Sequence, residues 1–254
     1  MPEGDSHTDW FDVAGPSEAR PIVFVHGVEI TRKLWTPQMT ALADEFRLIA
    51  VDLPGHGALS AEPFRLDTAV ERLARLIDEQ AGGKAVVVGF SLGGYVAMEL
   101  AARYADRLPG LVLAGCTWDL TGAPKLGYRA YARFTQLAGH GLLARLHDTH
   151  FRLLFPRRIH EPIRQAGFAV KVIPNVLEEL YGRDPRARLS EYPGPVLLLN
   201  GAWDLLFRRD ERAFLAATQR GRLELIPRAG HLMNLHRPHH FTEAVRRFAG
   251  SIDW

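Results

Sequence analysis

The sequence predicts an α/β fold in which a mostly parallel central sheet is flanked by helices and carries an inserted, all-helical segment. Three observations support this prediction. Short, β-branched apolar runs recur along the chain, helical patterns separate them, and the 73 residues of the stretch 118–190 contain no convincing strand. Uniformly apolar runs are typical of strands that are covered on both faces, as in parallel sheets. The alternation of strands with helices favours right-handed crossovers.

Six core strands are expected, and most are followed by a glycine or a polar residue. They are predicted at Ile22–Val25, Arg47–Val51, Ala85–Val88, Leu111–Ala114, Val196–Leu199 and Leu223–Ile226. One more short strand is expected around Trp10–Val13, ahead of the first core strand. Because parallel strands point the same way, the loops that follow them meet at one edge of the sheet, where open α/β sheets bind their ligands.

Helices are predicted from apolar residues that recur on one side, from small residues, or from a proline in the first turn. The core helices are expected at Asp67–Glu79, Leu92–Tyr104 and Pro238–Phe248, and those of the insertion at Tyr128–Leu137, Leu142–Leu154 and Val172–Leu180. An insertion of this length is too long for a bare connection. We therefore expect a core domain of residues 1–117 and 191–254, and a helical cap, or lid, of residues 118–190.

The composition is that of an ordinary globular protein, with 47% hydrophobic residues and a net charge of +2 in 254 residues. This charge provides no global field for nucleic acid, and the single cysteine, Cys116, excludes an intramolecular disulfide. The first twenty residues carry acidic groups where a secretory signal needs a basic end and an apolar run, and no apolar stretch is long enough to span a bilayer. We expect a cytoplasmic monomer or homodimer with a small-molecule substrate, no nucleic-acid partner and no membrane insertion.

The most specific motif is Gly89-Phe90-Ser91-Leu92-Gly93, which follows a predicted strand and precedes a predicted helix. This context is the one that the G-x-S-x-G motif requires. The sharp turn strains the serine backbone, and glycines two residues to either side remove side chains that would collide with neighbouring elements. The start of the helix also favours developing negative charge. The alternative is a glycine-rich turn with an incidental serine.

A serine hydroxyl needs a base that is held in place by an acid. Asp204 follows the predicted strand Val196–Leu199, and His231 follows the last predicted strand. The chain order is therefore Ser91, Asp204, His231, which is the order found in α/β-hydrolases.

With these motifs, the chain resembles the α/β-hydrolase fold superfamily, of the serine esterase and lactonase type, over roughly residues 21–117 and 193–250. The blocks that carry the resemblance further are His26-Gly27-x-x-x-Thr31-x-x-x-Trp35 and Asp52-x-Pro54-Gly55-His56-Gly57. The resemblance implies that Ser91 is the nucleophile, that His231 is the general base and then acid, and that Asp204 orients the imidazole. It also implies an oxyanion hole formed by the backbone N–H groups of Val28 and Leu92.

Asp119 is the alternative acid, because it follows the predicted strand Leu111–Ala114 and some members of the family place their acid there. His26 and His56 are expected to brace loops by hydrogen-bonding nearby backbone rather than to act in catalysis. Glu29, directly after a predicted oxyanion donor, is expected to pair with Arg32 in solvent, with tuning of the pocket as the alternative.

The segment 118–190 is expected to determine specificity. It holds twelve basic and six acidic side chains, a net charge of +6, which leaves −4 for the rest of the chain. One interpretation is a cap whose aromatic face closes an acyl pocket and whose arginines favour an anionic substrate; the other, which we prefer, is a cap core with a solvated basic surface. The predicted pocket residues are Trp118, Tyr128, Tyr131, Phe134, Phe151, Trp203 and Leu232.

The sequence thus predicts a cofactor-independent serine hydrolase, with no metal, that cleaves a carboxylic ester, thioester or lactone through an acyl-enzyme on Ser91. Non-ester chemistry on the same three residues stays open, as in a C–C bond hydrolase, a perhydrolase or a hydroxynitrile lyase. A weakly catalytic ligand-binding protein of the same fold is the remaining alternative.

Overall fold

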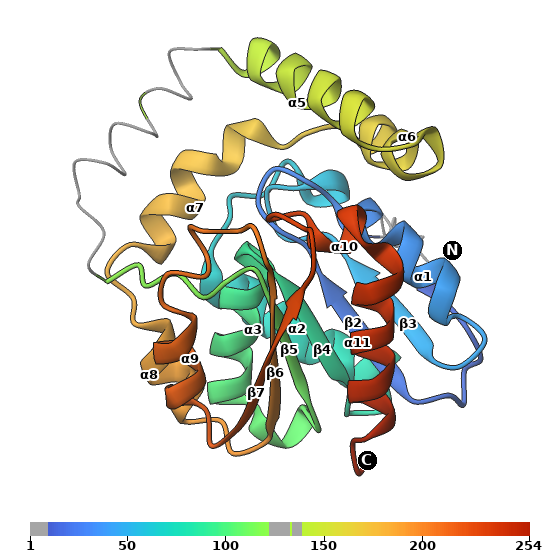
Figure 1. The fold of residues 1–254 in the computed structure, drawn as a ribbon, viewed down its shortest axis with the longest axis vertical. Coiled ribbons are helices and arrows are strands. Elements are labelled where there is room, and N and C mark those ends of the chain that lie inside the picture. Colours follow the sequence, from blue (N-terminus) through green and yellow to red (C-terminus); the bar gives the residue numbers. More distant parts are fainter. Residues whose placement is uncertain (1–9, 122–132, 134–138) are drawn as a thin grey trace, which may run out of the picture.

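In the computed structural model, which describes residues 10–121, 133 and 139–254, a seven-stranded sheet forms the centre of the molecule (Figure 1). The spatial order is β1-β3-β2-β4-β5-β6-β7. The β1 edge strand is antiparallel to β3, and all other neighbouring strands are parallel. The strands are β1 (Phe11–Ala14), β2 (Pro21–Val25), β3 (Arg47–Val51), β4 (Val86–Phe90), β5 (Leu111–Ala114), β6 (Pro195–Gly201) and β7 (Arg220–Ile226).

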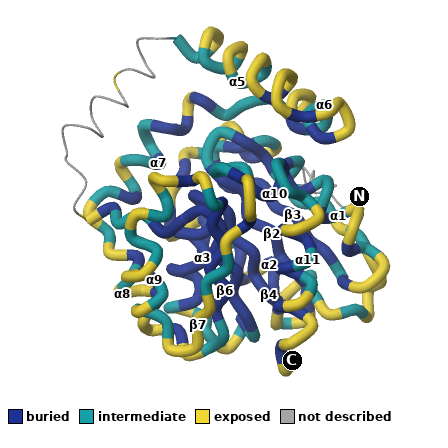
Figure 2. Tube along the Cα trace, viewed as in Figure 1, coloured by how far each residue is buried: buried dark blue, intermediate teal, exposed yellow. Residues whose placement is uncertain are grey.

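The sheet separates two apolar layers because successive side chains of a strand point to opposite faces. In β2, Ile22 and Phe24 pack in one layer, and Val23 and Val25 in the other. The first layer is covered by α1 (Thr36–Leu42), α10 (Met233–His236) and α11 (Pro238–Gly250). The second is covered by α2 (Leu66–Gln80), α3 (Leu92–Arg103), α8 (Pro185–Ser190) and α9 (Glu211–Ala217). The five inner strands, β2 to β6, are accordingly buried along most of their length, whereas the edge strands β1 and β7 are more exposed (Figure 2).

Among the described residues, four short 3₁₀ segments lie in the connections: η1 (Arg32–Trp35), η2 (Gly57–Leu59), η3 (Ala105–Arg107) and η4 (Val170–Val172). In η1, the hydroxyl oxygen of Thr31 accepts a hydrogen bond from the backbone N–H of Lys33 and caps the first turn.

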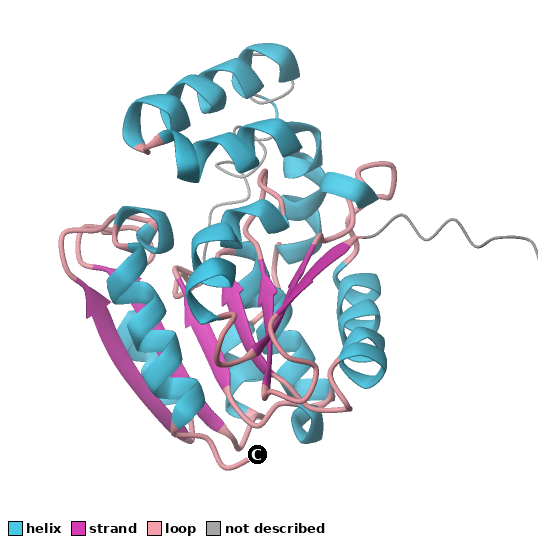
Figure 3. Ribbon diagram, turned by 90° about the vertical axis from the view of Figure 1, so that its right-hand side faces the viewer, coloured by secondary structure: helices cyan, strands magenta, loops and turns pink. Residues whose placement is uncertain are grey.

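The first two described helices of the segment 118–190 lie beyond the carboxyl ends of the parallel strands, whereas α8 lies beside the sheet (Figures 1 and 3). The described helices of this insertion are α5 (His140–Leu154), α6 (Arg157–Ala166) and α7 (Ile173–Leu180), together with α8. Helix α6 contacts η1 and α1 of the core, whereas α8 packs against α3 and α9. Two parts of the insertion, α6 and α8, therefore touch opposite sides of the sheet.

The predicted fold class is confirmed: the sheet is mostly parallel and is flanked by helices. Strands β3 and β5 have the predicted bounds, and the predicted N-terminal strand is present as β1. The expected helix Tyr128–Leu137 lies outside the described residues, apart from position 133. The division into a core domain and a cap stays a prediction. Within 10–121, 133 and 139–254, no helix combines the length and the apolar character needed to cross a bilayer.

Candidate active site

Ser91 occupies the turn between β4 and α3, with φ 51° and ψ −115°. A non-glycine residue in this left-handed region is strained, and such strain persists only where the surroundings enforce it. The glycines on either side are required by space. A Cβ on Gly89 would lie 2.4 Å from the carbonyl oxygen of Gly93, and one on Gly93 would lie 2.2 Å from that of Val25. The motif therefore folds into a strained turn that presents the hydroxyl at the carboxyl end of β4.

The structure brings Ser91, His231 and Asp204 together from three loops. His231 Nε2 lies 3.2 Å from Ser91 Oγ, and His231 Nδ1 lies 2.8 Å from Asp204 Oδ2. Both Ser91 and Asp204 are buried, whereas the His231 side chain is 34% exposed. An ionised carboxylate beside Nδ1 favours the tautomer in which that nitrogen donates, which leaves Nε2 able to accept the serine proton.

Two aromatic rings hold the imidazole of His231. Phe207 stacks on it with ring centroids 4.2 Å apart, and Phe90 packs at 4.8 Å. Phe207 also donates its backbone N–H to Asp204 Oδ1 over 3.3 Å, and its carbonyl oxygen accepts from the hydroxyl of Thr117. Sequence reasoning did not single out Phe207. Its position three residues after Asp204 could have indicated this role, because one short loop then positions both the carboxylate of Asp204 and the ring of Phe207.

Asp119, the alternative acid, has other partners than His231. Its carboxylate accepts from the backbone N–H of Thr121 over 2.9 Å and forms an ion pair with Arg186 at 2.7 Å. Its own N–H donates to Asp210 Oδ2. These contacts tie the start of the insertion to α8 and to the loop before α9, while Asp204 is the carboxylate at His231.

Two backbone N–H groups near Ser91, those of Leu92 and Val28, point away from the hydrogen-bonded carbonyl of their own peptide. The carbonyl of Ser91 accepts from the N–H of Gly94, so the N–H of Leu92, on the other side of that peptide, points the opposite way. The Gly27 carbonyl accepts from His26 Nδ1 over 2.7 Å, which in the same manner turns the N–H of Val28 away from His26. In the described part of the chain, neither N–H has an acceptor.

His26 and His56 hold the loop that carries Val28. His26 Nε2 accepts from the N–H of Leu53 at 3.0 Å, and His56 Nε2 accepts from the N–H of Glu29 at 3.3 Å. An accepting Nε2 is unprotonated, so both rings are neutral and donate through Nδ1. Burial lowers the pKa of His26 to about 4 and that of His56 to about 3, in agreement with neutral rings. Both histidines thus contact backbone, as predicted.

The expected pairing of Glu29 with Arg32 is wrong. Arg32 forms ion pairs with Asp12 and with the buried Asp52, which draw its guanidinium to the β1 side of the loop. Glu29 instead lies 3.3 Å from His147 Nδ1, on helix α5 of the insertion. The partner of Glu29 is therefore contributed by a segment more than a hundred residues away.

The predicted pocket residues have different surroundings. The Trp118 ring packs edge-on against Phe207 at 6.0 Å, and Phe151 is buried among aromatic side chains of the insertion. Leu232 is partly buried beside His231, whereas Trp203 is 66% exposed. The other three, Tyr128, Tyr131 and Phe134, lie outside the described residues.

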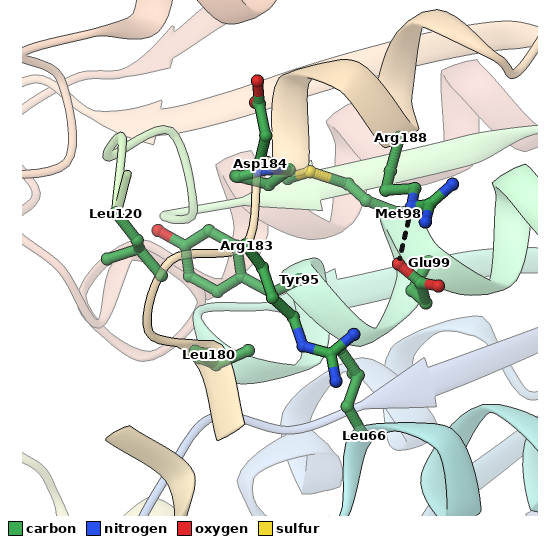
Figure 4. A pocket seen from close by; sticks show the side chains of 10 residues that line it. Leu66, Tyr95, Met98, Glu99, Leu120, Leu180, Arg183, Asp184 and Arg188 are labelled. Carbon is green, nitrogen blue, oxygen red and sulfur yellow. Dashed lines mark ion pairs between the residues drawn. The ribbon is translucent and has the colours of Figure 1, made fainter. Parts of the chain in front are cut away.

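A separate cavity lies between α3 and the segment that leads into α8 (Figure 4). Its floor includes Met98 and Leu180, and an ion pair between Arg188 and Glu99 crosses one side. Tyr95 lines it one helical turn after Ser91, and its hydroxyl donates to the carbonyl of Trp118. None of the three residues Ser91, His231 and Asp204 lines this cavity.

Residues 22–245 match the alpha/beta hydrolase family. The chain belongs to this family. The match agrees with the strand order, with the strained serine turn and with the sequence order of the three site residues. The predicted family and enzyme class, a hydrolase of the α/β-hydrolase fold, are thereby confirmed.

Among curated relatives, a pimeloyl-[acyl-carrier protein] methyl ester esterase of Nitrosospira multiformis is 28% identical over 91% of this chain and 95% of its own length. A Bacillus subtilis protein provisionally assigned as a 2-succinyl-6-hydroxy-2,4-cyclohexadiene-1-carboxylate synthase is 29% identical over 94% of this chain and 93% of its own. Among solved structures, an esterase from Thermogutta terrifontis matches with a TM-score of 0.78 and 27% identity, covering 93% of this chain and 91% of the other.

Proposed function

We propose that the protein is a serine hydrolase that cleaves a carboxylic ester, thioester or lactone of a small organic substrate through an acyl-enzyme on Ser91. One observation carries the proposal: the chain Ser91 Oγ–His231–Asp204, with distances of 3.2 and 2.8 Å, near two backbone N–H groups that have no acceptor in the described part of the chain. The esterase names of two relatives support the ester as the bond that is cleaved.

In the first half of the reaction, Ser91 Oγ attacks the carbonyl carbon of the ester while His231 Nε2 takes the hydroxyl proton. The N–H groups of Val28 and Leu92 donate to the oxygen that becomes negative, a stabilisation worth roughly 3–4 kcal/mol for one such donor. The bond to the leaving oxygen then breaks, and His231 gives its proton to that oxygen. The products of this half are an alcohol and an acyl-serine.

In the second half, water attacks the acyl carbon and His231 takes a proton from it. The bond to Ser91 Oγ breaks, the acid leaves, and the proton returns to the serine. Asp204 keeps its charge throughout and stabilises the transient imidazolium. The rings of Phe207 and Phe90 hold the imidazole in one plane during both proton transfers.

We propose that the insertion acts as a cap over this site. Its helices α5 and α6 lie beyond the carboxyl ends of the strands, which is the side on which Ser91 is presented (Figure 3). The acyl group would then be enclosed between the loops of the core and the insertion, whose buried aromatic residues include Phe151 and Phe155.

The test combines a fluorophosphonate probe with p-nitrophenyl esters of graded acyl length. We expect the probe to label the wild type at Ser91 and to leave Ser91→Ala unlabelled, with ester turnover lost in the same variant. The exposed serine of a matched Ser60→Ala variant tests whether removing any hydroxyl has this effect. Ester turnover that survives in Ser91→Ala would overturn the proposal.

A second candidate is non-ester chemistry at the same residues, and the synthase assignment of the Bacillus subtilis relative favours it. In that case His231 would move protons to and from a carbon or oxygen of the substrate without an acyl-serine. Probe labelling without turnover of any ester, thioester or lactone supports this candidate over the first.

A further inference from the structure

Glu29 directly follows Val28, the proposed oxyanion donor, and its backbone is unusual. Its φ of 71° lies in the left-handed region, where a side chain like that of glutamate is disfavoured by about 1 kcal/mol or more. A loop that needed only this backbone shape would be served better by glycine. The presence of a carboxylate here indicates that the side chain itself has a role.

Three contacts fix Glu29. Its N–H donates to His56 Nε2 over 3.3 Å, its carbonyl oxygen accepts from the N–H of Ala169 over 2.8 Å, and its carboxylate lies 3.3 Å from His147 Nδ1. The first contact belongs to the core. The other two come from separate parts of the insertion, helix α5 and the segment that precedes η4.

The contact with His147 is part of a packed junction between the insertion and the core. The His147 ring packs edge-on against Phe168 at 5.6 Å, and Phe168 packs against Phe151 at 5.4 Å. The side chain of Glu29 is 19% exposed, and burial raises its pKa to about 7. Burial also lowers the pKa of His147, so both partners of this contact are shifted toward their neutral forms.

The peptide between Gly27 and Val28 carries the proposed oxyanion donor, and the next peptide ends in the N–H of Glu29. We propose that Glu29 is a positioning residue that couples the seating of helix α5 to the orientation of the Val28 N–H beside Ser91. This inference rests on the proposed serine hydrolase function. When α5 packs against the core, Glu29 is fixed by contacts from the core and from the insertion, and the Val28 N–H points toward the position of the substrate oxygen. When α5 moves away, the strained backbone of Glu29 relaxes and the donor turns.

The coupling gives the insertion a role in the chemical step as well as in binding. A substrate that fills the space under the insertion and keeps α5 in place completes the oxyanion hole at the same time. A substrate too small to contact the insertion leaves the position of the donor dependent on the contacts of Glu29 itself, among them the one with His147. The effect of breaking that contact is therefore expected to be larger for short esters than for long ones.

The experiment is a double-mutant cycle of Glu29→Ala and His147→Ala, with kcat and KM measured on p-nitrophenyl acetate. Misplacing one donor is expected to lower kcat about tenfold in each single variant, with KM within about twofold of the wild type. The double variant is expected to be no slower than either single one, because both substitutions break the same contact. In Glu29→Gln, the amide oxygen accepts from His147 and is expected to restore kcat to within about threefold of the wild type.

Glu161→Gln is the matched control, because Glu161 is a carboxylate of the insertion whose polar partners in the described part of the chain, Arg164 and Gln165, lie on its own helix. It is expected to leave kcat and KM unchanged. Circular dichroism and thermal unfolding identify any variant that fails to fold, and Glu29→Gln keeps the test open if Glu29→Ala does not fold. Additive losses in the double variant, a change in KM alone, or a lowered melting temperature with unchanged kcat would each overturn the inference.

The two proposals fail in different ways. A wild type that is labelled by the fluorophosphonate and hydrolyses esters, while both single variants keep its kcat, overturns the positioning role and leaves the serine hydrolase intact. A wild type that is not labelled at Ser91 overturns the proposed function, and with it the inference.

Discussion

At the scale of single residues, two aspartates follow strands at the same edge of the sheet, and their contacts differ. Asp204 is 2.8 Å from His231, whereas Asp119 pairs with Arg186 and caps the backbone of Thr121. A carboxylate fixes an imidazole only where it contacts it, so the geometry favours one of the two as the acid of the proposed site.

We therefore predict opposite effects for two matched substitutions. Asp204→Asn is expected to lower kcat/KM for esters by about 10³–10⁴-fold, because the amide favours the wrong tautomer of His231. Asp119→Asn is expected to keep kcat/KM within about threefold and to lower the melting temperature by roughly 2–4 °C through the weakened contact with Arg186. Steady-state kinetics and thermal unfolding of both variants check this, and a larger kinetic loss in Asp119→Asn would contradict it.

Two residues buried beside the site, His26 and His56, and the mostly buried Glu29 connect the loop of Val28 to the pH dependence of stability. Burial lowers the pKa of His26 to about 4 and of His56 to about 3, against 6.5 for an exposed ring. At pH values between the folded and the unfolded pKa, the unfolded chain binds protons that the folded chain does not. The contribution of the two neutral histidines to the free energy of unfolding is therefore full above pH 6.5 and is lost as the pH falls. Burial raises the pKa of Glu29 to about 7, so the folded chain takes up a proton that the unfolded chain binds only near pH 4.5. The effect on the free energy of unfolding is opposite to that of the histidines, because protonation of Glu29 stabilises the folded chain as the pH falls from about 7.

These opposite effects predict that the two substitutions change the pH dependence of the free energy of unfolding in opposite directions. His56→Gln is expected to reduce the loss of unfolding free energy between about pH 7.5 and about pH 5 by roughly 2 kcal/mol, because one histidine no longer takes up a proton on unfolding. Glu29→Gln is expected to increase the loss, because the compensating proton uptake is removed. Urea denaturation across this pH range measures both, with the exposed His240→Gln as the control. Equal slopes in the wild type and all variants would contradict the assignment.

At the scale of elements, the features that were predicted correctly have local signatures. The turn at Ser91 is marked by two glycines, and strands β3 and β5 are short apolar runs with polar or glycine residues at their ends. Only the last four of the seven residues of strand β7 were predicted, because its first three, two arginines and a glycine, are exposed at the edge of the sheet and lack the apolar pattern. Helix α6 was not predicted. It has Pro162 in its interior, where a proline removes a helix hydrogen bond and interrupts the expected pattern.

The contacts that complete the site could not be predicted, because each joins elements far apart in sequence with no pattern to connect them. Phe207 reaches His231 from the loop after β6, and Thr117, after β5, reaches the carbonyl of Phe207. His147 reaches Glu29 from helix α5. A sequence shows that Glu29 is charged and unusual in its place, but its partner depends on how the insertion seats on the core.

At the scale of the whole molecule, the net charge of +2 divides into +6 on residues 118–190 and −4 on the rest. The structure shows which acidic groups pair with the basic side chains of the insertion. Its arginines pair mainly with acids of the insertion, and some reach the core, as Arg188 does with Glu99. Others, among them Arg145, Arg157 and Arg158, are exposed. This distribution favours a solvated basic surface over an anion-binding pocket.

We therefore predict that the enzyme does not select esters by their charge. The experiment compares a p-nitrophenyl ester whose acyl chain ends in a carboxylate with an uncharged ester of the same length. If the exposed arginines are solvated and do not contact the bound acyl group, the ratio of the two KM values is expected to change by less than about twofold between about 20 mM and about 500 mM NaCl. Salt screens charges strongly over this range, so a direct contact with the acyl group would change the ratio more. A KM for the anionic ester that rises steeply with salt, while that of the neutral ester stays constant, would contradict the prediction. It would show that charges of the insertion face the bound acyl group, and single substitutions of Arg145, Arg157 and Arg158 would then locate them.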